Sequence, residues 1–262
     1  MPKTVVITGA GTGIGEACAR RLAAEGANLV LIGRRSEPLQ RVAAETGGLI
    51  LVGDAADGPT WDRFIAEIGE RFGGIDALLA CAGGHGLGTA TETSDADWQN
   101  AMRGNLDSAF YSARACLPSL IERRGSIVLL GSIASLAAGP EVCGYTTAKH
   151  AVLGLNRSLA RDYGPQGVRV NCVCPGWVRT PMADEEMQPL MEHYGDDLDG
   201  AYARVTADVP LRRPATADEI ASICLFLISD QASIITGASI VADGGSSVVD
   251  VPTLAYTHLG GA

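Results

Sequence analysis

Three residues near the middle of the chain have the types and spacing that proton transfer requires. Tyr145 and Lys149 are four residues apart, so in a helix over about 144–163 they lie on one face. A phenol has an ordinary pKa of about 10, and a cation about 4 Å away favours its ionised form by roughly 4 kcal/mol. Ser132 ends an apolar segment and offers a hydroxyl. We therefore predict that Tyr145 is a general acid/base and that Ser132 hydrogen-bonds the oxygen whose proton moves.

The same spacing also occurs in ordinary amphipathic helices. Apolar residues in this segment form a stripe typical of a helix that packs on a core. The stripe comprises Ala148, Ala151, Val152, Leu155 and Leu159. The spacing alone leaves both interpretations open, so the elements that would position these residues must decide.

A glycine-rich turn follows the first predicted strand. Its sequence is Thr8-Gly9-Ala10-Gly11-Thr12-Gly13-Ile14-Gly15, and it opens the first predicted helix. Glycines let the backbone approach a pyrophosphate, and a helix N-terminus offers free N–H groups and the positive end of its dipole. Any tight strand-to-helix turn uses glycine. On the first β-α junction of an alternating series, however, the turn predicts a dinucleotide site.

The end of the second predicted strand carries Arg34 and Arg35, where an NAD-binding chain would carry an acidic residue. Two arginines at a helix start oppose its dipole by about 0.3–1 kcal/mol unless an anion joins them. The 2′-phosphate of NADP(H) is such an anion, and Arg suits its geometry. We therefore favour NADP(H), with NAD(H) possible. The alternative is a solvated loop with Glu37 as the counter-charge.

Weaker signals follow the next strands. Asp54 ends the third strand and could accept a hydrogen bond from an adenine amino group or cap the next helix. Residues 81–84 are small, as a backbone close under a ribose requires. Asn105 lies inside a predicted helix, where it either bonds a backbone group or marks a kink.

Short apolar runs alternate with helical patterns along the chain. Strands are predicted at 4–8, 28–33, 49–53, 76–82, 126–132, 168–174 and 239–242. Helices are predicted at 14–25, 36–46, 60–72, 98–123, 145–163 and 218–229. Apolar runs without strict alternation are typical of strands buried on both faces. The pattern predicts an α/β fold: a doubly wound, Rossmann-type parallel sheet with helices on both faces.

The 262 residues predict a single domain, 1–262, because no linker or repeat divides them. Residues 181–214 are rich in Met and acidic side chains and form a candidate lid, since they are too long for a simple connection. The tail, 246–262, is too apolar to be disordered. We expect it to pack across a subunit interface.

Composition excludes some classes of function. A net charge of −10 disfavours nucleic acid or an anionic membrane as a principal partner. Seven cysteines without C-x-x-C spacing are interpreted as reduced core residues of a cytoplasmic protein. Cys172 and Cys174 share a strand face, but no histidine nearby completes a ligand set, so no metal is predicted. No apolar run is long enough to span a membrane, and the first strand leaves no room for a signal peptide.

With the glycine turn, Ser132, Tyr145, Lys149 and Pro175-Gly176 in this order, residues 4–245 resemble the short-chain dehydrogenase/reductase family, in its compact single-domain branch. The resemblance implies a seven-stranded sheet and hydride transfer between a nicotinamide cofactor and a secondary alcohol or ketone. It also implies a homotetramer, or a homodimer, formed through helices near 98–123 and 145–163. The family usually has Asn where this chain has Cys81.

The resemblance implies a role for each matched position. Tyr145 would be the general acid/base, Ser132 would position the substrate oxygen, Lys149 would bond the nicotinamide ribose, and Asn105 would hold a water of a proton relay. The predicted cofactor contacts, which include the two arginines, are Gly9, Thr12, Gly13, Ile14, Gly15, Arg34, Arg35, Asp54, Ala55, Ala82, Gly83, Tyr145, Lys149, Pro175, Gly176, Val178 and Thr180.

Two alternatives and the substrate stay open. A β-ketoacyl carrier-protein reductase would need a basic patch for an acidic carrier, such as Arg123 and Arg124. A protein that only binds the nucleotide would need no base, cation and hydroxyl together. The predicted pocket for a small alcohol or ketone is apolar or mixed, and His85 could equally face solvent. Its candidate residues are His85, Leu136, Val142, Trp177, Met182 and Met187.

Overall fold

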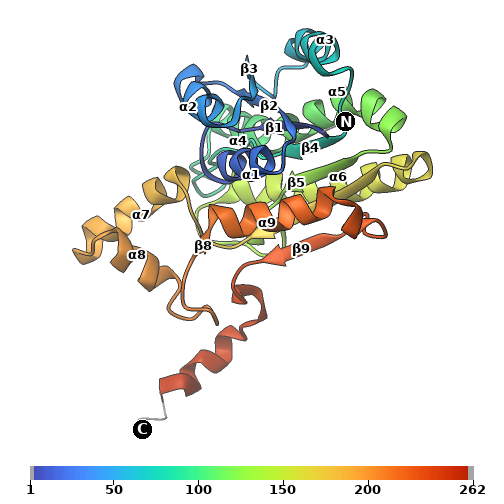
Figure 1. Cartoon of the computed structure of the whole chain (residues 1–262). Helices are drawn as coiled ribbons and strands as arrows, with labels where there is room; N and C mark the ends of the chain where they lie inside the picture. Colours follow the sequence, from blue (N-terminus) through green and yellow to red (C-terminus); the bar gives the residue numbers. More distant parts are fainter. Residues whose placement is uncertain (1–2, 259–262) are drawn as a thin grey trace.

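Seven parallel strands form the central sheet of the computed structural model, which describes residues 3–258 (Figure 1). Their order is β3-β2-β1-β4-β5-β6-β9, so the sheet winds outward in both directions from the β1/β4 junction. The predicted fold class is confirmed. The strands are β1 (Thr4–Thr8), β2 (Asn28–Gly33), β3 (Leu49–Val52), β4 (Ala77–Ala80), β5 (Ser126–Leu130), β6 (Arg169–Pro175) and β9 (Ser239–Ala242).

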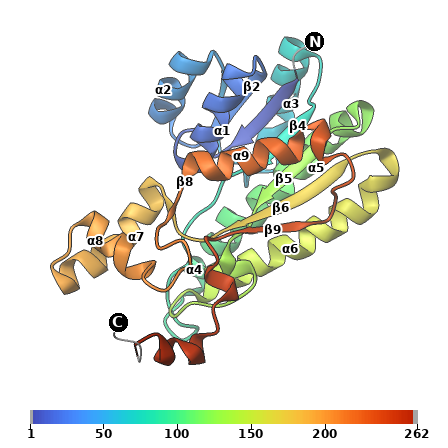
Figure 2. The ribbon, with the colours of Figure 1, turned by 60° about the horizontal axis from the view of Figure 1, so that its bottom comes forward.

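Helices cover both faces of this sheet (Figure 2). On one face lie α1 (Gly13–Ala24), α2 (Ser36–Thr46) and α9 (Ala217–Ile228). On the other lie α3 (Thr60–Phe72), α5 (Ser108–Arg123) and α6 (Cys143–Tyr163). The inner strands supply both cores: in β1, Val5 and Ile7 pack on the first layer and Val6 on the second. This explains the apolar runs without alternation.

The helix predicted at 98–123 is wrong as a single α-helix. Its first part, α4 (Asp95–Met102), begins earlier because Ser94 caps it by accepting the Asp97 N–H. A π-helical turn, Arg103–Asp107, then separates α4 from α5. Asn105 lies in this turn, and its amide donates to the carbonyls of Ala101 and Gly84. Both predicted possibilities for Asn105, a backbone bond and a local kink, therefore occur.

The strands predicted at 76–82 and 126–132 end at Ala80 and Leu130. The residues that follow leave the sheet at its carboxyl edge. The other strand and helix boundaries agree with the prediction to within two residues, and α6 begins at Cys143, two residues before the predicted start.

The candidate lid is more regular than predicted. It contains α7 (Pro181–Tyr194) and α8 (Leu198–Val205), which project from the body of the molecule (Figure 1). It leaves and rejoins the body through a short parallel ladder between β7 (Val178–Arg179) and β8 (Ala215–Thr216). The lid is therefore a small two-helix unit on a defined base.

The C-terminal tail extends away from the body as short 3₁₀ segments (Figures 1 and 2). Val248, Val251 and Tyr256 are at least 71% exposed, an unusual state for apolar side chains. The end of the predicted tail, residues 259–262, lies outside the described residues. That this tail covers a subunit interface stays a prediction.

The cysteines are all free, and five of the seven are buried. Among residues 3–258, no group of three or more His, Cys, Asp or Glu side chains is arranged to hold a metal ion. Within the same residues, no helix is both long and apolar enough to cross a membrane.

Candidate active site

The predicted site residues gather at the carboxyl edge of the sheet. The glycine turn follows β1, Gly83 follows β4, Ser132 follows β5, and Gly176 follows β6. In doubly wound sheets, ligands bind outside the carboxyl ends of the strands where the strand order reverses, here between β1 and β4. The topology therefore brings residues that are far apart in sequence to one crevice.

Lys149 is buried beside Tyr145. Only 4% of Lys149 is exposed to solvent, and its ammonium nitrogen lies 5.5 Å from the centre of the Tyr145 ring. That nitrogen donates to the Leu130 carbonyl at 2.9 Å, at the end of β5. The two residues thus share one face of α6, and the cation is held there by strand backbone. Tyr145 itself is fixed because its N–H donates to Gly86 O at 3.1 Å.

Ser132 begins the 3₁₀ turn Ile133–Ser135 as its N-cap. Its hydroxyl oxygen accepts the Ala134 N–H at 3.1 Å, and its own N–H donates to Ser135 Oγ at 3.1 Å. These bonds fix the position of the side chain, but in neither of them does the Ser132 hydroxyl act as the donor. The hydroxyl is therefore free to donate to a substrate oxygen.

Asn105 reaches the same corner from the π-helical turn. Its Oδ1 accepts the Gly84 N–H at 3.2 Å. A Cβ at Gly83 would lie 3.4 Å from that oxygen and 3.9 Å from Lys149 Nζ, so both polar groups border this glycine. The second lone pair of the oxygen can still accept a water. The water relay stays a prediction.

The glycine turn fits a pyrophosphate because side chains are excluded from it. Gly9 and Gly13 have φ of +65° and +57°, in the region that L-residues rarely adopt. A Cβ at Gly15 would lie 2.3 Å from Gly9 O, and one at Gly9 would lie 2.9 Å from Cys81 O. Thr12 is the N-cap of α1 but makes no side-chain capping bond. The first N–H groups of α1 therefore have no side-chain cap.

An unpredicted pair of residues braces this turn. Arg41 of α2 donates to both carboxylate oxygens of Glu16 in α1, at 2.6 and 2.8 Å, and to Gly11 O at 3.1 Å. The hydrogen bonds from Arg41 hold the pKa of Glu16 below its ordinary value. Ile14 is partly buried and packs into the core below. The two charged residues are 25 positions apart, so no local sequence pattern marks them.

Arg34 and Arg35 are both exposed at the end of β2. Within residues 3–258, neither guanidinium has a hydrogen-bond or ion-pair partner, and Glu37 does not pair with them. Two exposed cations beside α2 fit an anionic group of a ligand, although Arg34 is close enough to Asp54 to help lower the pKa of that carboxyl. The alternative of a local counter-charge is not supported.

Asp54 does not cap α3, whose N-cap residue is Pro59. Its carboxylate instead accepts from the Ala56 N–H and from two nitrogens of Arg103. Partial burial raises the pKa of Asp54, but the Ala56 and Arg103 bonds outweigh that effect and leave the pKa below its ordinary value. The carboxylate therefore stays ionised and can accept a further donor. Ala55 is buried, and its carbonyl accepts the Trp61 indole N–H.

Cys81 stands where the family usually has Asn, and its thiol does not reproduce the hydrogen bond that an amide side chain would make there. It packs against the core layer that contains Cys18 and Cys224, and contact with the Cys18 thiol together with burial raises the pKa of Cys81. The strand end is held differently, because Thr8 Oγ1 accepts the Ala82 N–H at 3.0 Å. This hydrogen bond to Thr8 was not predicted.

Two of the predicted cofactor contacts, Val178 and Thr180, lie at the base of the lid. Val178 is buried in β7, and Thr180 caps α7 by accepting the Ala183 N–H. A Cβ at Gly13 would lie 3.1 Å from the Thr180 methyl group, so the lid base lies against the glycine turn. Pro175 ends β6, and the Gly176 N–H donates a hydrogen bond to Ala242 O.

The predicted pocket residues fall into two groups. Leu136 and Met182 are exposed, and Val142 is partly exposed just before α6. Trp177 packs on the apolar cluster of the lid, and Met187 is fully buried inside it. Met187 therefore supports the lid and presents no surface to an open pocket. His85 extends from the loop after β4 to α7, where it meets Glu186.

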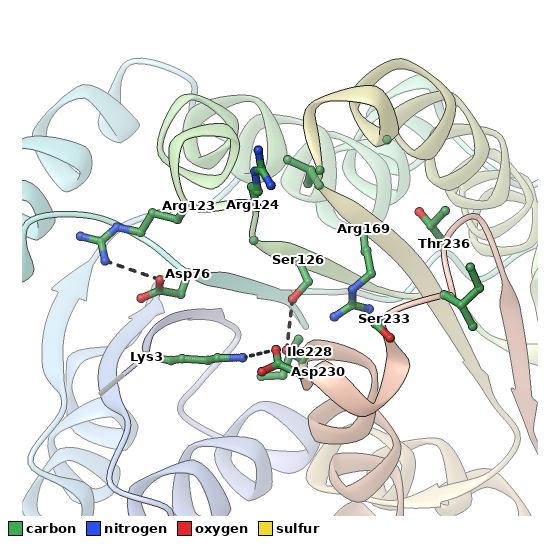
Figure 3. Close-up of a pocket in the computed structure, with 15 residues that line it drawn as sticks. Lys3, Asp76, Arg123, Arg124, Ser126, Arg169, Ile228, Asp230, Ser233 and Thr236 are labelled. Atoms are coloured by element: carbon green, nitrogen blue, oxygen red, sulfur yellow. Dashed lines mark hydrogen bonds and ion pairs between the residues drawn. The ribbon is translucent and has the colours of Figure 1, made fainter. Parts of the chain in front are cut away.

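A hollow of about 680 Å³ lies at the opposite, amino edge of the sheet (Figure 3). Several of its basic side chains bind carbonyl or carboxylate groups of the protein itself. Arg169 donates to the carbonyls of Leu227 and Ser229 at the end of α9, and Arg123 donates to Gly73 O. Lys3 pairs with Asp230. The two arginines meet carbonyls at the negative ends of α9 and α3. The hollow lies at the other edge of the sheet from Ser132 and Tyr145 and is separate from the candidate active site.

Comparison with known proteins agrees with this geometry. A family model described as enoyl-(acyl carrier protein) reductase matches residues 9–247. Protein MoaE of Klebsiella aerogenes is 54% identical over 260 residues, covering 98% of this chain and 100% of the relative. The meso-2,3-butanediol dehydrogenase of Serratia marcescens is 38% identical over 251 residues, covering 95% and 96%. L-Sorbose reductase of Gluconobacter frateurii, solved with NADPH and L-sorbose, superposes with a TM-score of 0.87 at 30% identity, covering 93% and 96%.

The chain belongs to the short-chain dehydrogenase/reductase family, and the predicted resemblance is confirmed. Its class is therefore an oxidoreductase with a nucleotide-binding Rossmann-type fold.

Replacing Gly15 by Ala tests the glycine turn. The new Cβ would have to displace Gly9 O, which lies 2.3 Å from its position. We expect affinity for NADPH to fall by at least about tenfold, equivalent to about 1.4 kcal/mol, as measured by fluorescence titration. Gly154→Ala in α6 is the matched control, because nothing lies within 4 Å of its Cβ position. Equal affinities for both variants would contradict a nucleotide site at this turn.

Proposed function

We propose that this chain interconverts a secondary alcohol and a ketone with NADP(H). The observation that supports this most strongly is the buried ammonium of Lys149 beside the Tyr145 ring, with the Ser132 hydroxyl on the same edge of the sheet. A base, a cation and a hydrogen-bond donor are the groups that proton transfer at an alcohol oxygen needs. The relatives named as a butanediol dehydrogenase and a sorbose reductase support the same reaction class.

The mechanism uses residues of this chain at the substrate oxygen. A bound nicotinamide supplies or accepts a hydride at the substrate carbon. During reduction, Tyr145 donates its phenolic proton to the carbonyl oxygen, and during oxidation it takes the alcohol proton back. The Ser132 hydroxyl donates to the same oxygen and orients it. The Lys149 ammonium favours the phenolate that is left after the proton has gone.

The residues that would hold the cofactor fit it. The glycine turn and α1 N-terminus suit a pyrophosphate, Asp54 suits the adenine amino group, and Gly83 leaves room for a ribose beside Lys149. Arg34 and Arg35 favour a 2′-phosphate because both are exposed and neither forms a hydrogen bond or ion pair in the described part of the chain. We therefore favour NADP(H), with NAD(H) as the alternative.

The other functions considered have less support. A protein that only binds the nucleotide would have no use for a buried lysine beside Tyr145 and Ser132. A carrier-protein reductase would need Arg123 and Arg124 near Tyr145, but Arg123 pairs with Asp76 at the amino edge of the sheet (Figure 3). Tyr145 lies at the other edge, where its N–H donates to Gly86 O in the loop after β4. A free small molecule is therefore the better substrate proposal. The homotetramer and the cytoplasmic location stay predictions.

Replacing Tyr145 by Phe tests the proposed acid/base role. The variant keeps the ring and loses the proton, so turnover should fall by about 10²–10⁴-fold, while the dissociation constant of NADPH stays within about threefold. A panel of ketones and diols, followed at the nicotinamide absorbance, measures this. Tyr163→Phe, at the far end of the same helix, is the control and should turn over normally. Normal turnover by Tyr145→Phe would refute the role.

A double variant, Arg34→Ser with Arg35→Ser, tests cofactor choice. Loss of charge-assisted bonds to a phosphate should raise the KM for NADPH by about 10–100-fold and leave the KM for NADH nearly unchanged. Steady-state kinetics with each reduced cofactor measure the two constants. The double variant Arg157→Ser with Arg161→Ser, at two exposed arginines of α6, controls for the change in net charge. An unchanged KM for NADPH would favour NAD(H) instead.

A further inference from the structure

The lid has its own small core, separate from the two layers of the body. Ala183 and Met187 of α7 pack against Ala201 and Tyr202 of α8, and Trp177 joins them from the lid base. Tyr202 also donates to Asp184 at 2.8 Å and lies under the Arg179 guanidinium. α7 and α8 are thus fastened to each other. Such a unit can move as one body on its base.

His85, in the loop after β4, joins α7 to the body of the protein. A carboxylate can only accept, so His85 Nδ1–H donates to Glu186 Oε1 at 3.0 Å. His85 Nε2 lies 3.7 Å from Glu185 Oε2. Between residues 3 and 258, these are the ion-pair contacts that join α7 to the loop after β4. The Glu186 side chain is 30% exposed, whereas that of Glu185 is 75% exposed, so Glu186 is the more firmly held partner.

The loop that carries His85 is itself tied to Tyr145. Gly86, the next residue, accepts the Tyr145 N–H through its carbonyl. A Cβ at Gly86 would lie 2.5 Å from Tyr145 N, so the loop lies directly against the start of α6. A contact between His85 and α7 therefore fixes the lid relative to the residue that exchanges the proton. α7 begins at Pro181, and its N-cap residue Thr180 lies next to the glycine turn.

We propose that His85 and Glu186 form a clasp that holds the lid closed over the substrate, which makes His85 a positioning residue of the reaction. The inference rests on the proposed function, because it assumes that a substrate binds between Tyr145 and α7. The clasp explains why a histidine stands beside two glutamates at the crevice. His85 then acts through the lid and does not touch the reacting atoms.

The clasp is expected to act on binding more than on chemistry. Both side chains are about one-third exposed, so solvent screens the pair and its contribution is modest. Loss of the pair should raise the KM for the substrate by about twofold to fivefold. The value of kcat should change by less than about twofold, because Tyr145, Ser132 and Lys149 stay in place.

The experiment compares His85→Ala, Glu186→Ala and the double variant. If the clasp exists, the double variant has no higher KM than either single variant, because the second substitution removes a partner that is already lost. Glu192→Ala is the matched control: it lies on the same helix and removes the same charge, but it has no ion-pair partner among the described residues. It should leave KM unchanged. Additive effects of the two single variants, or an equal effect of Glu192→Ala, would overturn the proposal.

Amide hydrogen exchange gives a readout that needs no substrate. With NADPH bound, amides of residues 181–194 should exchange at least about twofold faster in both clasp variants than in the wild type, and no faster in Glu192→Ala. Unchanged exchange in α7 would overturn the clasp. If the wild-type protein reduces no carbonyl compound at all, the proposed function fails, and hydrogen exchange alone then decides whether the clasp exists.

Discussion

The constraint on which the site depends is a buried ammonium group. Lys149 is almost fully removed from water, which is unfavourable for a charge unless nearby groups compensate it. The Leu130 carbonyl provides one partner, and the face of the Tyr145 ring provides a second favourable contact. An ammonium has three donors. The two that remain can bond a phenolate and a cofactor ribose, so the same charge that needs compensation also promotes the proposed chemistry.

The elements around Lys149 are shaped to keep this group in place. β5 ends at Leu130, so that its last carbonyl meets the ammonium and the chain turns to present Ser132. The π-helical turn brings Asn105 to the other side, next to Gly83. The loop after β4 then fixes the start of α6 through Gly86. Each of these local irregularities departs from a regular strand or helix at the point where the site requires it.

The regular parts of the fold could be predicted because apolar runs and helical stripes repeat along the chain. The strand order could not be derived from them, since it depends on how segments pair in space. The glycine turn and the Tyr145–Lys149 spacing were visible because their residues are close in sequence. Long-range partners were not: Arg41 with Glu16, Arg103 with Asp54, and His85 with Glu186. A backbone bond or a kink at Asn105 was predicted, but the π-helical form of the turn and the partner Gly84, 21 residues away, were not.

Alcohol oxidation by Lys149→Met tests most directly whether the Lys149 charge promotes proton removal by Tyr145. The variant replaces the ammonium beside the Tyr145 ring by an uncharged side chain of similar length. With cofactor and alcohol both saturating, turnover should fall by at least about tenfold, because a phenolate beside a cation is favoured by electrostatic attraction. A variant that binds the cofactor and turns over at the wild-type rate would contradict the account.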